Sequence, residues 1–165
     1  RSQAKTFIYA LMYGAGPAKI GAVVGGSAKE GQELTNRFLK NMPRLRNLRN
    51  QVTEAAESGL IKGLDGRLLH IRNAFSALNT LIQGAGAVVC KQWLVHMMSN
   101  VYAQGLDVKL VGSIHDEYQF EVANQDVKRF TEITKYAMTK TTKTLNLNCP
   151  LDSEHKVGTT WLQTH

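Results

Sequence analysis

Hydrophobic residues recur at intervals of three and four along the first third of the chain, a spacing that is typical of amphipathic helices. Ser27 followed by Glu30 matches a capping box, and Pro43 is a favourable residue for the first turn of a helix. Glycines and a proline after residue 13, and Gly59 further on, are stop signals. The pattern predicts helices over residues 2–13, 18–24, 28–40 and 43–58.

The rest of the chain mixes helical spacing with strict alternation of apolar and polar residues. Asp65-Gly66 is a favoured two-residue turn, so a hairpin is predicted over residues 60–71. Long helical patterns cover residues 76–104 and 125–144. Between them, residues 107–122 show the period of two of half-buried strands. The predicted fold class is α+β, with helices first and then helices against a small antiparallel sheet.

Composition narrows the possible function classes. A chain of 165 residues, 43% of them hydrophobic, is long enough for one sizeable core. The net charge of +7 favours a polyanionic partner such as a nucleic acid. Cys90 and Cys149 form no disulfide framework, which indicates a reduced, cytoplasmic setting. The sequence has no signal peptide or membrane-spanning run, and because no methionine precedes Arg1 we expect a fragment or a processed chain.

The first predicted helix carries four residues of interest at intervals of four: Arg1, Lys5, Tyr9 and Tyr13. Residues four apart on a helix are offset by about 40° and rise about 6 Å, so these four form one slowly winding stripe. Two cations followed by two aromatic rings match a molecule that is anionic at one end and planar at the other, such as a nucleoside triphosphate. The alternative is an ordinary amphipathic helix with solvated cations.

Two adjacent carboxylates, Asp116 and Glu117, lie at a predicted turn in the sequence IHDEY. They repel each other unless a cation lies close, and their hard oxygen atoms suit Mg²⁺. His115 beside them is a candidate for positioning a substrate group or binding a phosphate. The alternative is a solvated acidic turn.

The longest predicted helix carries two amides on one face, Asn79 and Gln83, followed by the small residues Gly86 and Cys90. Neutral amides can donate to the N3 and O2 acceptors that every base pair shows in the minor groove. Such contacts would test the shape of a base pair rather than its sequence. The alternative is ordinary hydrogen bonding at a helix cap or between helices.

Together these motifs resemble those of DNA polymerase family A. The stripe ending in Tyr13-Gly14 resembles the fingers helix of that family, SIHDEYQF (113–120) resembles its palm hairpin, and ALNTLIQGAGA (77–87) resembles the segment before that hairpin. The stretches KTFIYALMYGAGPAKIGAVVG and IKGLDGR and the terminal W…H are most similar to replicative polymerases of short-tailed phages. The chain is thus identified as a C-terminal part of a right-hand polymerase, with fingers helices over about 1–58 and the remaining fingers and palm over about 59–165.

The resemblance implies a role for each matching residue. Arg1 and Lys5 would hold the triphosphate of the incoming nucleotide, and Lys5 would also protonate the departing pyrophosphate. Tyr9 would lie by the sugar and base, where a tyrosine favours acceptance of dideoxynucleotides. Tyr13 would stack at the template position or close the nascent base pair. Asp116 would bind magnesium and Glu117 would assist near the metals. The residues expected to contact the primer-template are His115, Asn79, Gln83 and Gly14.

The resemblance also implies a two-metal Mg²⁺ site that catalyses in-line attack of a primer 3′-hydroxyl on an α-phosphate. A second metal-binding aspartate of the family precedes the fingers helix, so we expect these 165 residues alone not to polymerise. The implied partners are primer-template DNA and deoxynucleotides, and a processivity factor would bind regions outside this chain. The chain departs from the family at Phe75, where DNA polymerase I homologues carry an arginine that contacts the minor groove.

Two other functions fit parts of the pattern. A phage-type single-subunit RNA polymerase shares the fingers helix and the His-Asp turn, but those enzymes usually follow the aspartate with serine, where this chain has Glu117. A non-catalytic basic DNA-binding module would bind duplex in a salt-sensitive way without a magnesium-dependent nucleotide site. For the polymerase, the expected setting is the cytoplasm of a bacterial host.

Overall fold

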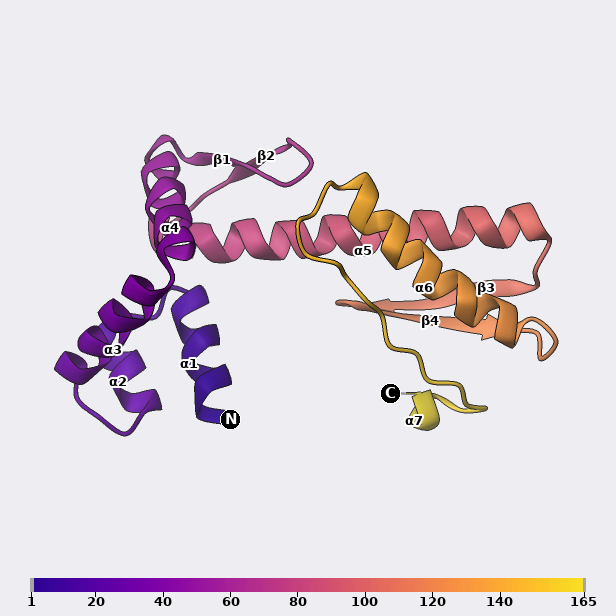
Figure 1. The fold of residues 1–165 in the computed structure, drawn as a ribbon, viewed down its shortest axis with the longest axis horizontal. Coiled ribbons are helices and arrows are strands. Elements are labelled where there is room, and N and C mark those ends of the chain that lie inside the picture. The colour runs from indigo at the N-terminus through magenta and orange to yellow at the C-terminus, as the bar shows by residue number, and fades with distance from the viewer. Residues whose placement is uncertain (1, 165) are drawn as a thin grey trace. The chain divides into compact units, whose positions relative to one another are not determined.

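The protein is described by a computed structural model that covers residues 2–164 and forms two compact units, one up to Ala85 and the other from Gly86 onward (Figure 1). Each unit combines helices with a two-stranded antiparallel sheet, which confirms the α+β class. The predicted division between fingers and palm near residue 58 stays a prediction.

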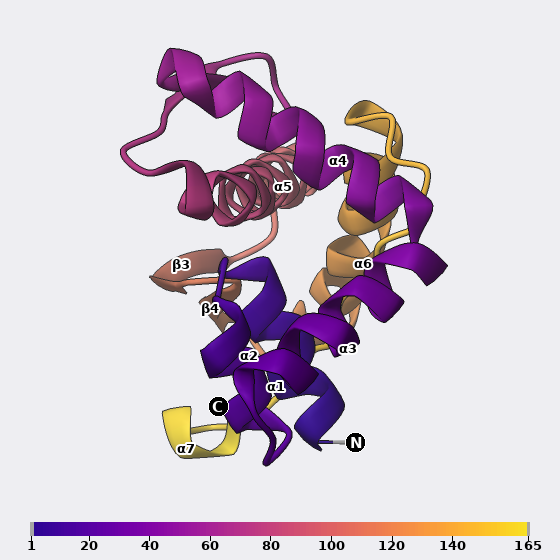
Figure 2. The same ribbon diagram turned by 90° about the vertical axis from the view of Figure 1, so that its left-hand side faces the viewer.

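The first unit opens with four helices, close to the predicted bounds: α1 (Ser2–Met12), α2 (Pro17–Val23), α3 (Ala28–Asn41) and α4 (Pro43–Ala55). Both ribbon views show α1, α2 and α3 side by side (Figures 1 and 2). The capping box forms as predicted, because Glu30 N donates to Ser27 Oγ (3.3 Å) and Ser27 N donates to Glu30 Oε2 (2.7 Å). Hydrogen bonds from Ser27 hold the pKa of the Glu30 carboxyl below its ordinary value.

Close backbone approach determines how α2 and α3 pack. A Cβ atom on Gly31 would lie 2.2 Å from the carbonyl oxygen of Pro17 and 2.5 Å from the nitrogen of Gly21, so only glycine fits there. The neighbouring core contains Phe7, Leu11 and Ile20. The ring of Phe7 meets that of Phe38 edge to face at 5.2 Å. The helices of α1 to α3 therefore form one packed group.

The hairpin of the first unit forms, but its turn differs from the prediction. Strands β1 (Leu60–Lys62) and β2 (Leu68–His70) pair antiparallel. Gly66 N donates to Gly63 O (3.0 Å), and Gly63 N donates to Arg67 O (2.8 Å), so Leu64 and Asp65 are the central residues of the turn. Gly66 follows in left-handed backbone (φ 84°). The predicted two-residue turn is therefore wrong, and a longer loop with a glycine bulge takes its place.

Two short 3₁₀ turns link this hairpin to its neighbours: η1 (Ala56–Ser58) precedes it, and η2 (Ala74–Ser76) leads into the long helix α5 (Ala77–Gln104). The buried residues of this part form one cluster of Val52, Ala56, Ile61, Ala77 and Leu78. Among the described helices, none is long and apolar enough to cross a membrane.

The second unit contains the rest of α5, a hairpin of β3 (Val108–Ile114) and β4 (Glu117–Val122), and helices α6 (Val127–Thr144) and α7 (Trp161–Thr164). The indole Nε1 of Trp93 donates to the carbonyl oxygen of Thr134 (2.9 Å), which ties α5 to α6. Met97 and Ala137 are fully buried in the same core. The hairpin contributes Val108 to that core, and Tyr118 and Phe120 pack against it.

Candidate functional site

Helix α1 separates its buried side chains from the residues predicted to bind a nucleotide. Phe7 and Leu11 are buried, whereas Lys5 is exposed and Tyr9 and Tyr13 are 60% and 54% exposed. The predicted stripe is therefore a solvent-facing row, as a nucleotide-binding face requires. Arg1, its first member, lies outside the described residues.

Gly14, the residue after Tyr13, lies closely against the 3₁₀ turn η2, which precedes α5. It has left-handed backbone (φ 74°), and a Cβ atom there would lie 2.2 Å from the carbonyl oxygen of Phe75. Only glycine tolerates both the conformation and the approach. This contact holds the end of α1 next to η2.

A hydrogen bond joins α1 to α5 at the same place. Gln83 Nε2 donates to the hydroxyl oxygen of Tyr13 at 3.1 Å. Hydrogen bonding between helices was the alternative for the amides of α5, and the structure shows such a bond for Gln83. Asn79, one turn earlier on α5, is half-buried, and Gln83 is exposed. Their predicted contact with a minor groove stays a prediction.

The predicted acidic turn lies at the tip of the second hairpin, one residue earlier than expected. His115 and Asp116 form the turn, and Glu117 is the first residue of β4, paired with Ile114. His115 and Asp116 are exposed and Glu117 is half-buried. His115 adopts left-handed backbone (φ 55°), which is uncommon for a residue with a side chain and recurs at functional sites.

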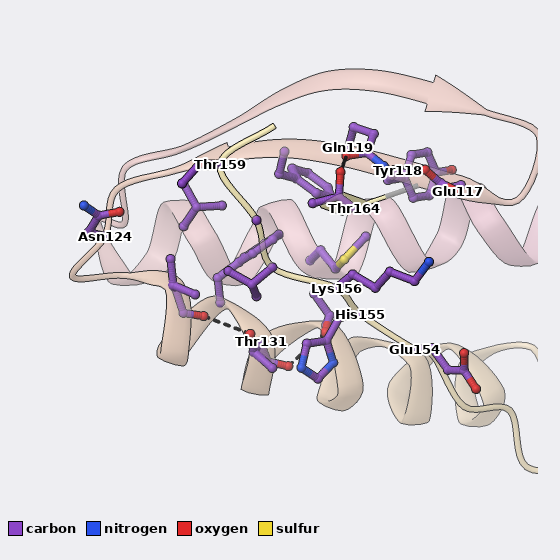
Figure 3. A pocket seen from close by; sticks show the side chains of 18 of the residues that line it. Glu117, Tyr118, Gln119, Asn124, Thr131, Glu154, His155, Lys156, Thr159 and Thr164 are labelled. Atoms are coloured by element: carbon purple, nitrogen blue, oxygen red, sulfur yellow. Dashed lines mark hydrogen bonds between the residues drawn. The ribbon is translucent and has the colours of Figure 1, made fainter. Parts of the chain in front are cut away.

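A chain of side-chain hydrogen bonds holds Glu117 in place (Figure 3). Gln119 Nε2 donates to Glu117 Oε1, and Thr164 Oγ1 donates to Gln119 Oε1 at 3.2 Å. Gln119 stands two residues after Glu117 on β4. Because side chains two apart on a strand share a face, the alternation in the sequence predicts that these two are neighbours. Thr164, which is 45 residues further along the chain, has no such signal.

The acidic turn affects the pKa of Cys90, a residue of α5. Burial raises the pKa of the Cys90 thiol, and the negative charge of Asp116 raises it further. The group is therefore held as a neutral thiol at neutral pH rather than as a nucleophilic thiolate. Both effects disfavour the thiolate form of Cys90.

The donor set on the hairpin fits part of a magnesium site. Asp116 and Glu117 are adjacent carboxylates, the ligand type that Mg²⁺ prefers. Within residues 2–164, no three or more histidine, cysteine, aspartate or glutamate side chains gather closely enough to hold a metal ion. Among the described residues, Asp116 and Glu117 are therefore two candidate ligands and not a complete set.

A cavity of about 530 Å³ opens beside Glu117 in the second unit (Figure 3). Aromatic side chains line one side: Trp93, Tyr118, Phe120 and Phe130. The segment around His155 and Lys156, which has no regular secondary structure, lines another. The arrangement suits an apolar or planar group with polar atoms at its edge.

The predicted site residues divide between the units. The first unit contains Lys5, Tyr9, Tyr13, Gly14, Asn79 and Gln83, and the second contains His115, Asp116 and Glu117. Within the first unit, the structure brings Tyr13 and Gln83 into contact. Within the second, it places the histidine and both acids on one hairpin.

Comparisons with known proteins agree with these motifs. The model of the family described as DNA polymerase family A matches residues 1–163. The DNA-directed DNA polymerase of Escherichia phage Phieco32 is 40% identical over all of this chain and 28% of its own length. That of Enterobacteria phage T3 is 37% identical over all of this chain and 27% of its own length. The chain thus spans just over a quarter of these relatives.

A solved structure shares the fold. It is described as the POL domain of Pol1 from M. smegmatis in complex with DNA primer-template and dNTP. It matches with a TM-score of 0.77 at 20% identity, over 85% of this chain and 27% of that one. At this identity the match supports the fold alone.

The contact at Gly14 can be tested against a matched glycine. Gly14→Ala and Gly25→Ala both place a side chain on left-handed backbone, but a Cβ atom on Gly25 meets nothing within 4 Å. We expect Gly14→Ala to lower the free energy of unfolding of the full-length protein by about 1–3 kcal/mol more than Gly25→Ala, because it also overpacks the contact with Phe75. Denaturant titration measures the difference, and equal losses would contradict the contact.

Proposed function

The chain belongs to DNA polymerase family A, and we propose that the full-length protein adds deoxynucleotides to the 3′ end of a primer, copying template DNA during phage replication. The observation that carries this proposal is the family match over residues 1–163, which includes both the exposed row on α1 and the acidic hairpin. Extension of a primer by the full-length protein with dNTPs, and not with NTPs, tests it against an RNA polymerase.

On α1, the proposed role of the exposed row is to hold the incoming nucleotide. Lys5 would neutralise the triphosphate and give a proton to the departing pyrophosphate, and Arg1 would also bind the triphosphate. Tyr9 and Tyr13, both more than half exposed, offer aromatic faces to the sugar and base. Their exposure is what this role needs, because a buried ring has no face left for a ligand.

On the second hairpin, Asp116 and Glu117 would hold Mg²⁺ together with a carboxylate from another part of the full-length protein. Bound Mg²⁺ ions stabilise charge on the attacking and leaving oxygens during in-line displacement. Gln119 positions Glu117 through the hydrogen bond to Oε1. His115, held in strained backbone at the exposed tip, would contact the primer end.

The amides of α5 would contact the minor groove near the primer terminus. Gln83 is exposed, and its amide nitrogen donates to the hydroxyl oxygen of Tyr13. Asn79 stands four residues earlier on the same helix face. Gly14, which follows Tyr13, would contact the primer-template through its backbone. Because all base pairs show the same acceptors in the minor groove, such contacts would check pair geometry in any sequence.

The remaining proposals concern the cellular context. As a phage replication enzyme, the protein would act in the cytoplasm of a bacterial host. The fingers would comprise about residues 1–58, and the palm hairpin would lie in the remainder. A processivity factor, if the enzyme uses one, would bind regions outside this chain.

We expect Asp116→Ala in the full-length protein to abolish nucleotide addition, because it removes a metal-binding carboxylate. Primer-template affinity should be largely kept. Single-turnover extension and an equilibrium binding titration measure the two quantities. Glu121→Ala, which removes an exposed carboxylate from the same hairpin, is the matched control and should extend normally. Ordinary turnover in Asp116→Ala would remove this residue from the metal site.

We expect Tyr9→Phe to reduce sharply the use of dideoxynucleotides relative to deoxynucleotides. The tyrosine hydroxyl would lie beside the sugar of the incoming nucleotide, so its loss changes contacts at the 3′ position. Competition between ddNTP and dNTP in a termination assay measures the ratio. Tyr136→Phe, at a similarly exposed tyrosine of α6, serves as the control. An unchanged ratio would refute the role of Tyr9.

A further inference from the structure

Phe75 is an apolar side chain that the first unit leaves in solvent. It is 78% exposed, more than either tyrosine of the row on α1. An exposed phenylalanine contributes little to the stability of the unit, because the favourable term comes from removing apolar surface from water. Its exposure therefore calls for an explanation outside the core.

The backbone of Phe75 is hydrogen-bonded and closely packed, although its side chain is exposed. Asn73 Oδ1 accepts a hydrogen bond from Phe75 N (2.9 Å), and the carbonyl oxygen of Asn73 accepts one from Ser76 N (3.0 Å). The carbonyl group of Phe75 meets Gly14 on its other side. Because these contacts already order the backbone of Phe75, binding through its exposed ring would cost little further backbone entropy.

The surroundings of Phe75 identify the kind of ligand. Gly14, where an added Cβ atom would meet the backbone of Phe75, directly follows Tyr13, whose ring is also exposed. Arg72 is an exposed cation three residues before it. Exposed aromatic rings accompanied by cations are the composition of surfaces that stack nucleobases and attract their phosphates.

We propose that Phe75 stacks on a nucleobase of the bound primer-template, next to Tyr13. This inference rests on the proposed function. Because every base has an aromatic face, the contact strengthens binding without selecting a sequence. Stacking releases no counterions, so its contribution to affinity stays the same as the salt concentration rises, unlike that of an arginine bound to phosphate.

A different occupant, an apolar protein surface, predicts a different pattern of substitutions. Leucine keeps apolar packing but removes the aromatic face, whereas tryptophan keeps and enlarges that face. If Phe75 packs on protein, Phe75→Leu retains affinity and Phe75→Trp loses it. If Phe75 stacks on a base, the order is reversed.

The experiment measures the dissociation constant of primer-template for the full-length protein at two salt concentrations. We expect Phe75→Ala and Phe75→Leu to weaken binding by about five- to 150-fold, the range for loss of one base–aromatic stack. The loss should be equal at both salt concentrations. Phe75→Trp should bind like the unsubstituted protein. Tyr102→Ala is the matched control, because this tyrosine of α5 is 76% exposed, and it should leave binding unchanged.

A spectroscopic readout identifies the base. 2-Aminopurine is placed in turn at the primer end and at the neighbouring template positions. At one position, its fluorescence should be quenched in the unsubstituted complex and recover with Phe75→Ala. All variants should keep the melting temperature, because the side chain is exposed.

Three results would overturn the inference. Phe75→Ala could bind primer-template DNA as tightly as the unsubstituted protein, or Phe75→Leu could keep the affinity while Phe75→Trp loses it. The third is a fall in melting temperature that accompanies the weaker binding. If the unsubstituted protein extends primers and any of these is seen, only the role of Phe75 fails. If the unsubstituted protein does not extend primers with dNTPs, the proposed function fails, and the role of Phe75 fails with it.

Discussion

The first unit depends on the contact between Gly14 and the carbonyl group of Phe75. A side chain on Gly14 would overlap that oxygen, so the end of α1 can meet the start of α5 only through glycine. The contact brings the hydroxyl group of Tyr13 to within 3.1 Å of the amide of Gln83. It thereby places one end of the exposed row on α1 beside the amide face of α5. Residues that are 70 positions apart in sequence become one surface.

The bond between Tyr13 and Gln83 also bears on how nucleic acid would be bound. The side-chain amide nitrogen of Gln83 carries two N–H donors, and Tyr13 accepts from one of them. The second donor would serve a minor-groove acceptor, so the proposed contact does not require the bond to Tyr13 to break. The bond to Tyr13 also orients the amide, which lowers the entropy lost when a base pair is contacted.

In the second unit, the tip of the acidic hairpin is exposed, whereas strand β4 is packed against the core. Tyr118 and Phe120 of β4 pack against the core formed by α5 and α6, which keeps the strand in place. Gln119, between them, orients Glu117 and is itself bonded by Thr164. Glu117 is held by this hydrogen bond, Asp116 is exposed at the tip, and no third histidine, cysteine, aspartate or glutamate among the described residues joins them. Within residues 2–164, the hairpin therefore offers two candidate ligands and not a complete metal site.

Sequence alone determined the helices, the capping box at Ser27 and the solvent-facing row on α1, because these follow from spacing within a few residues. It also located both hairpins, although it misjudged the turn at Asp65, where the glycine follows the turn instead of lying at its centre. Only the tertiary structure revealed the contact of Gly14 with Phe75, the bond from Gln83 to Tyr13 and the support of Glu117 by Thr164. These pairs lie far apart in the chain, and local spacing has no information about which distant side chains meet when the helices pack.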